Sequence, residues 1–234
     1  MSADSKLKNV TTIDKSFIEN LRKPQFPGSY FLSFEGIEGA GKSLQIARTS
    51  EFLERLQFRV IILREPGGTV FGERLRNAIL ESKKDIHPLA ETHLFLASRT
   101  QLLSEVTLSE LAKPGTIVIY DRYIDSTLSY QGCARGLGMN EVLKCHQSFP
   151  LNLMPHLTFY LKISPETSLA RQKIRNAPKD YFESKGMDFY QLLVEGFDAC
   201  AEQFSNRIVT IDAENDVDEV QSDIQHCTKK LLGI

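Results

Sequence analysis

Residues 36–43 read G-I-E-G-A-G-K-S and match the phosphate-binding loop pattern G-x-x-x-x-G-K-[ST] in full. The apolar run Y-F-L-S-F at 30–34 precedes them and predicts a buried strand, and apolar residues at helical spacing follow from 44 to 56. In such a strand–loop–helix unit, backbone N–H groups and the helix N-terminus surround phosphate oxygens. The segment therefore predicts that a nucleoside triphosphate binds here, and leaves open what happens to it.

The whole loop is expected to bind the nucleotide. Lys42 is expected to reach the β- and γ-phosphates, and the Ser43 hydroxyl to hold Mg²⁺. The predicted nucleotide-binding residues are Gly36, Ile37, Glu38, Gly39, Ala40, Gly41, Lys42 and Ser43.

Apolar runs and helical patterns alternate along the rest of the chain. Four further strands are predicted at 58–63, 116–120, 156–163 and 207–211. Helices are predicted at about 70–81, 89–112, 139–149 and 216–232, and Ser164 is expected to cap a helix that begins at Pro165. This alternation predicts right-handed crossovers and an α/β fold, with a parallel five-stranded sheet flanked by helices. Its ligand should lie at the C-terminal edge of the sheet.

Composition argues against a nucleic-acid-binding, membrane-spanning or secreted protein. A net charge of −2 argues against a dedicated nucleic-acid binder, and the four scattered cysteines without a C-x-x-C pair suit a reducing compartment. No apolar run approaches the ~20 residues of a membrane span, and the polar start resembles no signal peptide. We therefore expect a cytoplasmic protein without membrane or nucleic-acid partners. Residues 1–28 are expected to form a flexible extension, and residues 29–234 one domain.

Three polar residues follow predicted strands at the expected ligand edge. Asp121 closes the run at 116–120, where a carboxylate could orient Mg²⁺ opposite Ser43. Arg64 and Arg122 would suit a clamp on a second phosphate group. A turn-capping aspartate and two solvated arginines remain the alternative interpretation.

Two other groups of residues have both a functional and a structural interpretation. Phe95 and Arg99 lie one helical turn apart, so they could stack on and hydrogen-bond a nucleobase, or be a core ring and a surface charge. A basic cluster that includes Arg171 and Arg175 could be a mobile lid that brings cations to a transferred phosphoryl group, or a solvated helix face.

Five strings of residues together resemble the thymidylate kinases. They are F-E-G-I-E-G-A-G-K-S at 34–43, R-E-P-G-G-T at 64–69, A-S-R-T-Q at 97–101, D-R-Y-I-D-S-T-L-S-Y-Q-G at 121–132 and P-H-L-T-F-Y-L at 155–161. The resemblance extends from about residue 30 to 232. It implies the three-layer fold of P-loop nucleoside monophosphate kinases with a lid at about 171–186, phosphorylation of dTMP to dTDP with ATP and Mg²⁺, and a homodimer.

The resemblance also implies roles for individual residues. Glu38 would meet the sugar 3′-hydroxyl, Tyr130 would select deoxyribose, and Arg64 and Arg122 would hold the acceptor phosphate. Phe95 would stack on thymine, Arg99 would donate to its O4, and Thr127 and Gln131 would complete the substrate-binding residues. Lys42, Arg122, Arg171 and Arg175 would be the catalytic cations, with Ser43 and Asp121 at the metal. Only one of the five strings contains a histidine, His156 in P-H-L-T-F-Y-L, and none of the named site residues is a histidine, which suits a reaction that needs little acid–base chemistry.

Two departures bear on the catalytic cations. Gly39 stands where one branch of the family has an arginine, which resembles the bacterial-type arrangement with lid arginines. The lid itself has Tyr181 where the family usually has an arginine, so Arg175 or Arg171 would have to substitute. A kinase of altered base specificity with weakened lid catalysis, and a nucleotide-binding regulatory protein, therefore remain alternatives.

Overall fold

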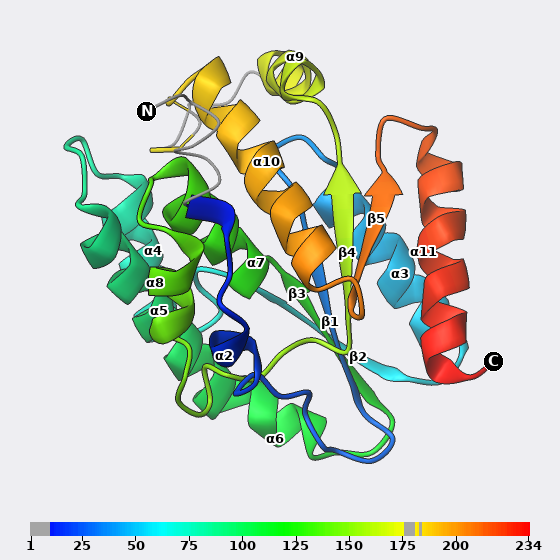
Figure 1. Cartoon of the computed structure of the whole chain (residues 1–234). Coiled ribbons are helices and arrows are strands. Elements are labelled where there is room, and N and C mark those ends of the chain that lie inside the picture. Colours follow the sequence, from blue (N-terminus) through cyan, green and yellow to red (C-terminus); the bar gives the residue numbers. More distant parts are fainter. Residues whose placement is uncertain (1–9, 176–180, 183) are drawn as a thin grey trace.

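A parallel five-stranded sheet forms the centre of the molecule (Figure 1). The computed structural model describes residues 10–175, 181–182 and 184–234, with the backbone alone for Arg175. Within these residues the strand order is β2–β3–β1–β4–β5. The strands are β1 (Tyr30–Glu35), β2 (Arg59–Arg64), β3 (Thr116–Asp121), β4 (Leu157–Lys162) and β5 (Ile208–Asp212). The predicted α/β fold is thus confirmed.

Helices cover both faces of the sheet (Figure 1). On one face, α3 (Lys42–Arg55) contacts β1, β2 and β3, and α11 (Val217–Leu232) packs beside α3. On the other face, α10 (Met187–Gln203) contacts β4 and β5. Further helices among the described residues are α2 (Lys15–Ile18), α4 (Val70–Leu80), α5 (Pro88–Leu102), α6 (Leu108–Leu111), α8 (Met139–Lys144) and α9 (Pro165–Arg175). No helix in the described ranges is both long and apolar enough to cross a bilayer.

Several helical regions differ from the sequence prediction, which among others included no helix at α10 (Met187–Gln203). The helix predicted at 139–149 ends at Lys144, since the backbone then forms tight turns in which His146 N–H bonds to the Leu143 carbonyl. A helical segment that was not predicted follows β3 and consists of α7 (Ile124–Thr127) and the π-helical turn η2 (Leu128–Ala134). All residues from 123 to 133 are buried, so this segment lacks the polar face that makes a helix recognisable in a sequence.

The described part of the first 28 residues lies against the domain. Ile13 is buried, and the Asp14 N–H donates to Asn140 Oδ1 at 2.8 Å. Further along, Arg22 forms an isolated parallel bridge with Leu153. These contacts attach residues 10–28 to α8 and to the segment that leads into β4.

A buried ion pair joins α7 to the far side of the sheet. Arg207, just before β5, donates to both carboxylate oxygens of Asp125 at 2.8 and 2.6 Å, and the two side chains are 3% and 1% exposed. Arg207 also donates to the Thr158 hydroxyl in β4 at 3.0 Å. Because both charges are satisfied, the pair fixes the position of α7 directly after the end of β3.

Removing one charge of this pair should be costly. We expect Arg207→Met to lower the free energy of unfolding by about 3–5 kcal/mol, because it leaves the Asp125 carboxylate buried and unpaired. The double variant Asp125→Leu with Arg207→Met should recover a large part of this loss. Urea unfolding followed by circular dichroism measures both; a double variant no more stable than the single one would contradict the interpretation.

Candidate active site

The phosphate loop connects β1 to α3, as predicted, and its backbone requires glycine at position 36. Gly36 has φ of +132°, and a Cβ there would overlap the carbonyl oxygen of Leu161 in the neighbouring strand β4. Lys42 Nζ donates to the carbonyls of Gly36 at 2.9 Å and Ile37 at 3.2 Å. Burial, followed by the repulsion of Arg122, lowers the pKa of Lys42 to about 8. The loop thus keeps a positive charge at its centre at neutral pH.

Asp121 and Ser43 supply oxygen atoms beside the loop. Asp121 ends β3, and its Oδ1 is buried without a hydrogen-bond partner among the described residues. Ser43 is exposed in the first turn of α3. The described ranges hold no group of three or more His, Cys, Asp or Glu side chains that could bind a metal ion by themselves. A hard divalent cation would therefore fit here only with phosphate oxygens and water as its other ligands.

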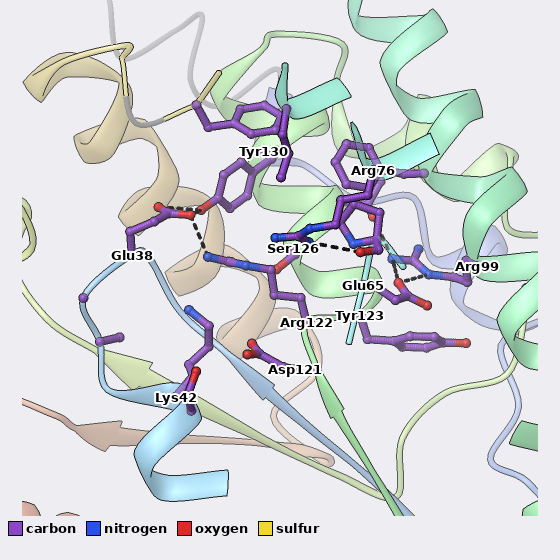
Figure 2. A pocket seen from close by; sticks show the side chains of 18 of the residues that line it. Glu38, Lys42, Glu65, Arg76, Arg99, Asp121, Arg122, Tyr123, Ser126 and Tyr130 are labelled. Carbon is purple, nitrogen blue, oxygen red and sulfur yellow. Dashed lines mark hydrogen bonds and ion pairs between the residues drawn. The ribbon is translucent and has the colours of Figure 1, made fainter. Parts of the chain in front are cut away.

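Arg122 links the loop to the pocket beside it (Figure 2). Its backbone has φ of +72°, unusual for a residue with a side chain. Nη1 donates to the Gly36 carbonyl at 2.9 Å and to Ser126 Oγ at 3.2 Å, and Nη2 donates to Glu38 Oε1 at 2.7 Å. Its guanidinium lies 5.1 Å from the centre of the Tyr130 ring. Three hydrogen-bond acceptors and one aromatic ring therefore fix the position of the Arg122 guanidinium.

Glu38 and Tyr130 close this arrangement on the pocket side (Figure 2). The Tyr130 hydroxyl lies 2.7 and 2.8 Å from the two carboxylate oxygens of Glu38, to which it donates. Burial alone would raise the pKa of Glu38, but Arg122, Lys42 and the tyrosine hydroxyl together hold it below its ordinary value. Glu38 is therefore ionised and acts as a fixed acceptor between loop and pocket.

Glu35 stabilises the chain that follows Arg122 through two hydrogen bonds. This fully buried residue at the end of β1 accepts the Tyr123 N–H at 2.7 Å and the Ser126 hydroxyl at 2.5 Å. Burial, and next to it the charge of Asp125, raises the pKa of Glu35 to about 7. The residue lies within a quoted sequence string, yet nothing in the sequence assigned it a role.

A cavity of about 380 Å³ extends from the phosphate loop along the C-terminal edge of the sheet. One end is polar and is lined by the loop, Asp121 and Arg122. The other end carries the expected substrate residues Phe95, Arg99, Thr127, Tyr130 and Gln131, with Leu80 and Phe182 beside them. The structure therefore brings together two halves that are about 50 to 100 residues apart in the sequence.

Arg99 is 1% exposed and is held by three side chains. It donates to Glu65 Oε2 from Nε at 2.7 Å, to Thr127 Oγ1 from Nη2 at 3.0 Å and to His146 Nε2 from Nη1 at 2.8 Å. Its guanidinium also lies 4.7 Å from the Tyr123 ring centre. The sequence indicated Arg99 and Thr127 but not His146, which belongs to no motif and follows the end of α8.

Phe95 and Gln131 line the same end of the pocket. Phe95 lies 6.3 Å from Phe182, ring centre to ring centre, and forms an aromatic wall with it. Gln131 donates from Nε2 to Glu91 Oε1 at 2.7 Å, which fixes its amide at the pocket wall. This half can therefore accept a flat apolar group with polar edges.

The two expected phosphate-clamp arginines are not both in the pocket. Arg64 is more than half exposed and pairs with Glu73 at 3.0 Å, and it is absent from the lining of the cavity. Arg76, from α4, lines the cavity instead and donates to the Pro66 carbonyl at 3.0 Å (Figure 2). Arg64 was expected at the site because it directly follows a predicted strand. In the structure, the turn at 65–69 leaves Arg64 facing solvent and brings α4, with Arg76, to the cavity.

The lid residues are described only in part. Arg171 donates to the Gly39 carbonyl at 2.9 Å, so α9 lies on the phosphate loop, and a Cβ at Gly39 would be 3.3 Å from that of Arg171. The Arg175 side chain and residues 176–180 and 183 lie outside the described residues. The Tyr181 hydroxyl donates to Asp85 Oδ1 at 2.8 Å. The residue at the usual arginine position thus binds the loop before α5.

The buried Glu35 carboxyl should make stability depend on pH. Its folded pKa of about 7 exceeds its ordinary value of 4.5, so its stabilising contribution is complete below pH 4.5 and is lost as pH rises through 7. We expect the free energy of unfolding of the unmodified chain to fall by up to about 3 kcal/mol between pH 5 and 8 from this group. Glu35→Gln, which resembles the protonated form, should reduce this slope, as measured by urea unfolding across that range. An unchanged slope would contradict the assignment.

Comparisons with known proteins agree with this geometry. The family model described as thymidylate kinase matches residues 34–224. A thymidylate kinase of Thermoanaerobacter sp. (strain X514) is 38% identical over 202 residues, which cover 86% of this chain and 98% of that protein. The thymidylate kinase of Chlorobium luteolum is 40% identical over 199 residues, 82% of this chain and 92% of that protein. The crystal structure of thymidylate kinase from Ehrlichia chaffeensis superimposes with a TM-score of 0.70 at 27% identity, covering 87% of this chain and all of that one. The chain therefore belongs to the thymidylate kinase family.

Proposed function

We propose that this protein is a thymidylate kinase, which transfers the γ-phosphoryl group of ATP to dTMP and yields dTDP and ADP. The observation that carries the proposal is the position of Arg122. It binds the phosphate loop through the Gly36 carbonyl and contacts Glu38 and Tyr130 at the entrance of a pocket lined by Phe95 and Arg99. A cation in that position can contact a phosphate group of each substrate.

The donor half consists of the phosphate loop and its neighbours. Its backbone N–H groups and Lys42 would hold the triphosphate of ATP. Mg²⁺ would be held by Ser43 and Asp121 together with phosphate oxygens, and would neutralise part of the phosphate charge. The buried, unpartnered Asp121 Oδ1 supports this role, because a polar atom in that state lacks a compensating interaction.

The acceptor half would bind dTMP in an extended orientation along the cavity. Arg122 and Arg76 line it and would hold the monophosphate, while Glu38 would accept a hydrogen bond from the sugar 3′-hydroxyl. Tyr130 is fixed by Glu38, so it would exclude a 2′-hydroxyl by occupying its space. Phe95 would stack on thymine, and the remaining polar wall would be supplied by Arg99, Thr127 and Gln131.

Transfer then depends on positioning and charge. An oxygen of the dTMP phosphate attacks the γ-phosphorus in line, while the bond from that phosphorus to the β–γ bridging oxygen breaks and ADP leaves. Lys42 and Arg122 would stabilise the charge that spreads over the transferred group. Arg171 and Arg175, in a lid at about 171–186, would supply further cations. No residue is required to remove a proton from the already ionised phosphate.

Further properties are proposed from the resemblance and composition. They are a homodimer, a cytoplasmic location, and a kinase domain at 29–234 preceded by an extension at 1–28. The absence of a spanning helix in the described part of the chain is compatible with that location.

A coupled assay of ADP release tests the activity. Purified protein with ATP and Mg²⁺ should turn over dTMP faster than dCMP or AMP, because Tyr130 and Arg99 favour a deoxyribonucleotide with an acceptor at C4. dUMP carries the same acceptor but lacks the 5-methyl group, so it should be turned over more slowly than dTMP. Absence of turnover on dTMP, or a clear preference for another monophosphate, would reject the proposal.

Two arginine variants distinguish the clamp seen in the structure from the one predicted by sequence. Arg76→Ala should raise the KM for dTMP by about tenfold or more, since each charged hydrogen bond contributes roughly 1.5–3 kcal/mol. Arg64→Ala should change it by less than about twofold, because an exposed ion pair contributes at most about 1 kcal/mol. A larger effect at Arg64 than at Arg76 would restore the sequence-based assignment.

A further inference from the structure

The hydrogen-bond donors of Arg99 are almost all used inside the protein. A guanidinium has five N–H donors in one plane and no acceptor. Glu65 Oε2 accepts from Nε at 2.7 Å and forms an ion pair with Nη2 at 2.5 Å, and Thr127 accepts from Nη2 at 3.0 Å. His146 Nε2, at 2.8 Å from Nη1, takes a third donor. Among the described residues, Nη2 is engaged by Thr127 and by the charge of Glu65, whereas one N–H of Nη1 remains for a group in the cavity.

The partner of Nη1 must be a neutral imidazole in a defined tautomer. Because arginine can only donate, His146 Nε2 has to be the unprotonated nitrogen. The proton then resides on Nδ1, which donates to the Val142 carbonyl at 2.8 Å. Burial, and next the charge of Arg99, lowers the pKa of His146 to about 3, so the ring stays neutral at physiological pH. Both ring nitrogens are therefore satisfied in one tautomer only.

The backbone holds this ring in place. His146 is completely buried, and its N–H bonds to the Leu143 carbonyl in the turn that ends α8. The Val142 carbonyl that accepts from its ring belongs to the same helix. The ring thus reaches Arg99 from the side of α8, whereas Glu65 reaches it from the end of β2. The guanidinium cannot rotate without breaking at least one of these contacts.

We propose that His146 is a positioning residue for base selection: its Nε2 fixes the Nη1 group of Arg99, so that the remaining N–H is presented to an acceptor on the pyrimidine. The inference rests on the proposed function and deepens it. Thymine carries an acceptor, O4, where cytosine carries the N4 amino group, a donor. An arginine held in one orientation offers the cytosine amino group no acceptor, which leaves two donors facing each other.

Three variants test this role. His146→Leu removes the acceptor at similar volume, and His146→Gln can place its amide oxygen near the position of Nε2. His156→Leu is the matched control, because His156 is also a largely buried histidine that accepts a backbone N–H, from Phe31 at 2.9 Å, but is not among the residues that line the cavity. Binding of dTMP and dCMP is measured by calorimetry without ATP, and kcat and KM for dTMP and ATP in the coupled assay.

The expected result is a change in selectivity rather than in stability alone. His146→Leu should weaken dTMP binding by about tenfold, because Arg99 loses one hydrogen bond that fixes its charged group. The KM for ATP should stay within about twofold of the wild-type value. dCMP binding should change by less than about twofold, so the preference for dTMP falls. His146→Gln should restore most of the preference. His156→Leu should lower the melting temperature without altering the dTMP-to-dCMP ratio.

Other outcomes would overturn the inference. Equal losses for dTMP and dCMP, or a selectivity change of the same size in His156→Leu, would assign His146 a purely structural role. Nitrogen-15 spectra of the labelled imidazole rings give a readout that is independent of catalysis, and a protonated Nε2 on His146 between pH 6 and 8 would also overturn it. Wild-type protein that binds dTMP without transferring phosphate would reject the proposed function but leave this inference standing. Protein that binds neither pyrimidine would reject both.

Discussion

The site depends on the way Arg122 is held at the end of β3. A left-handed backbone costs a residue with a side chain roughly 1–2 kcal/mol, and Arg122 has φ of +72°. Hydrogen bonds to the Gly36 carbonyl, Glu38 and Ser126 offset that cost. Ser126 is in turn held by the buried carboxyl of Glu35. The backbone conformation that places the Arg122 guanidinium over the phosphate loop therefore depends on Ser126 and Glu35. A substitution at either of these residues should also affect the position of Arg122.

The cations around the loop are distributed differently from the family pattern. Position 39 is a glycine that lies against Arg171 and Ser168 of α9, so a side chain there would meet the helix. Tyr181, at the usual arginine position, donates to Asp85 rather than facing the loop. Among the described side chains, Lys42, Arg122 and Arg171 thus place positive charge on the phosphate loop, where each binds a backbone carbonyl. The tyrosine instead joins the segment of the expected lid to the loop before α5.

The sequence predicted those features that leave a local pattern of residues. It did not predict features that depend on contacts with residues far away in the chain. Strand, loop and helix around the phosphate loop were predictable because each has its own spacing of apolar residues. The helical segment from 124 to 134 was not, because burial on all sides erases the amphipathic pattern. Whether Arg64 or Arg76 lines the cavity depends on the path of the turn at 65–69, which the sequence does not reveal. The contact of His146 with Arg99 joins positions 47 residues apart, and no local signal marks it.

If the proposed mechanism holds, the two halves of the site achieve specificity by different physical means. The donor half uses backbone groups and a lysine, which recognise phosphate regardless of the base attached to it. The acceptor half uses side chains whose partners are themselves buried, so their orientation exists before a ligand arrives. Such an arrangement gains little affinity, since most donors of Arg99 are already used. It gains discrimination, because a ligand with the wrong group at that position meets a rigid donor that cannot turn away.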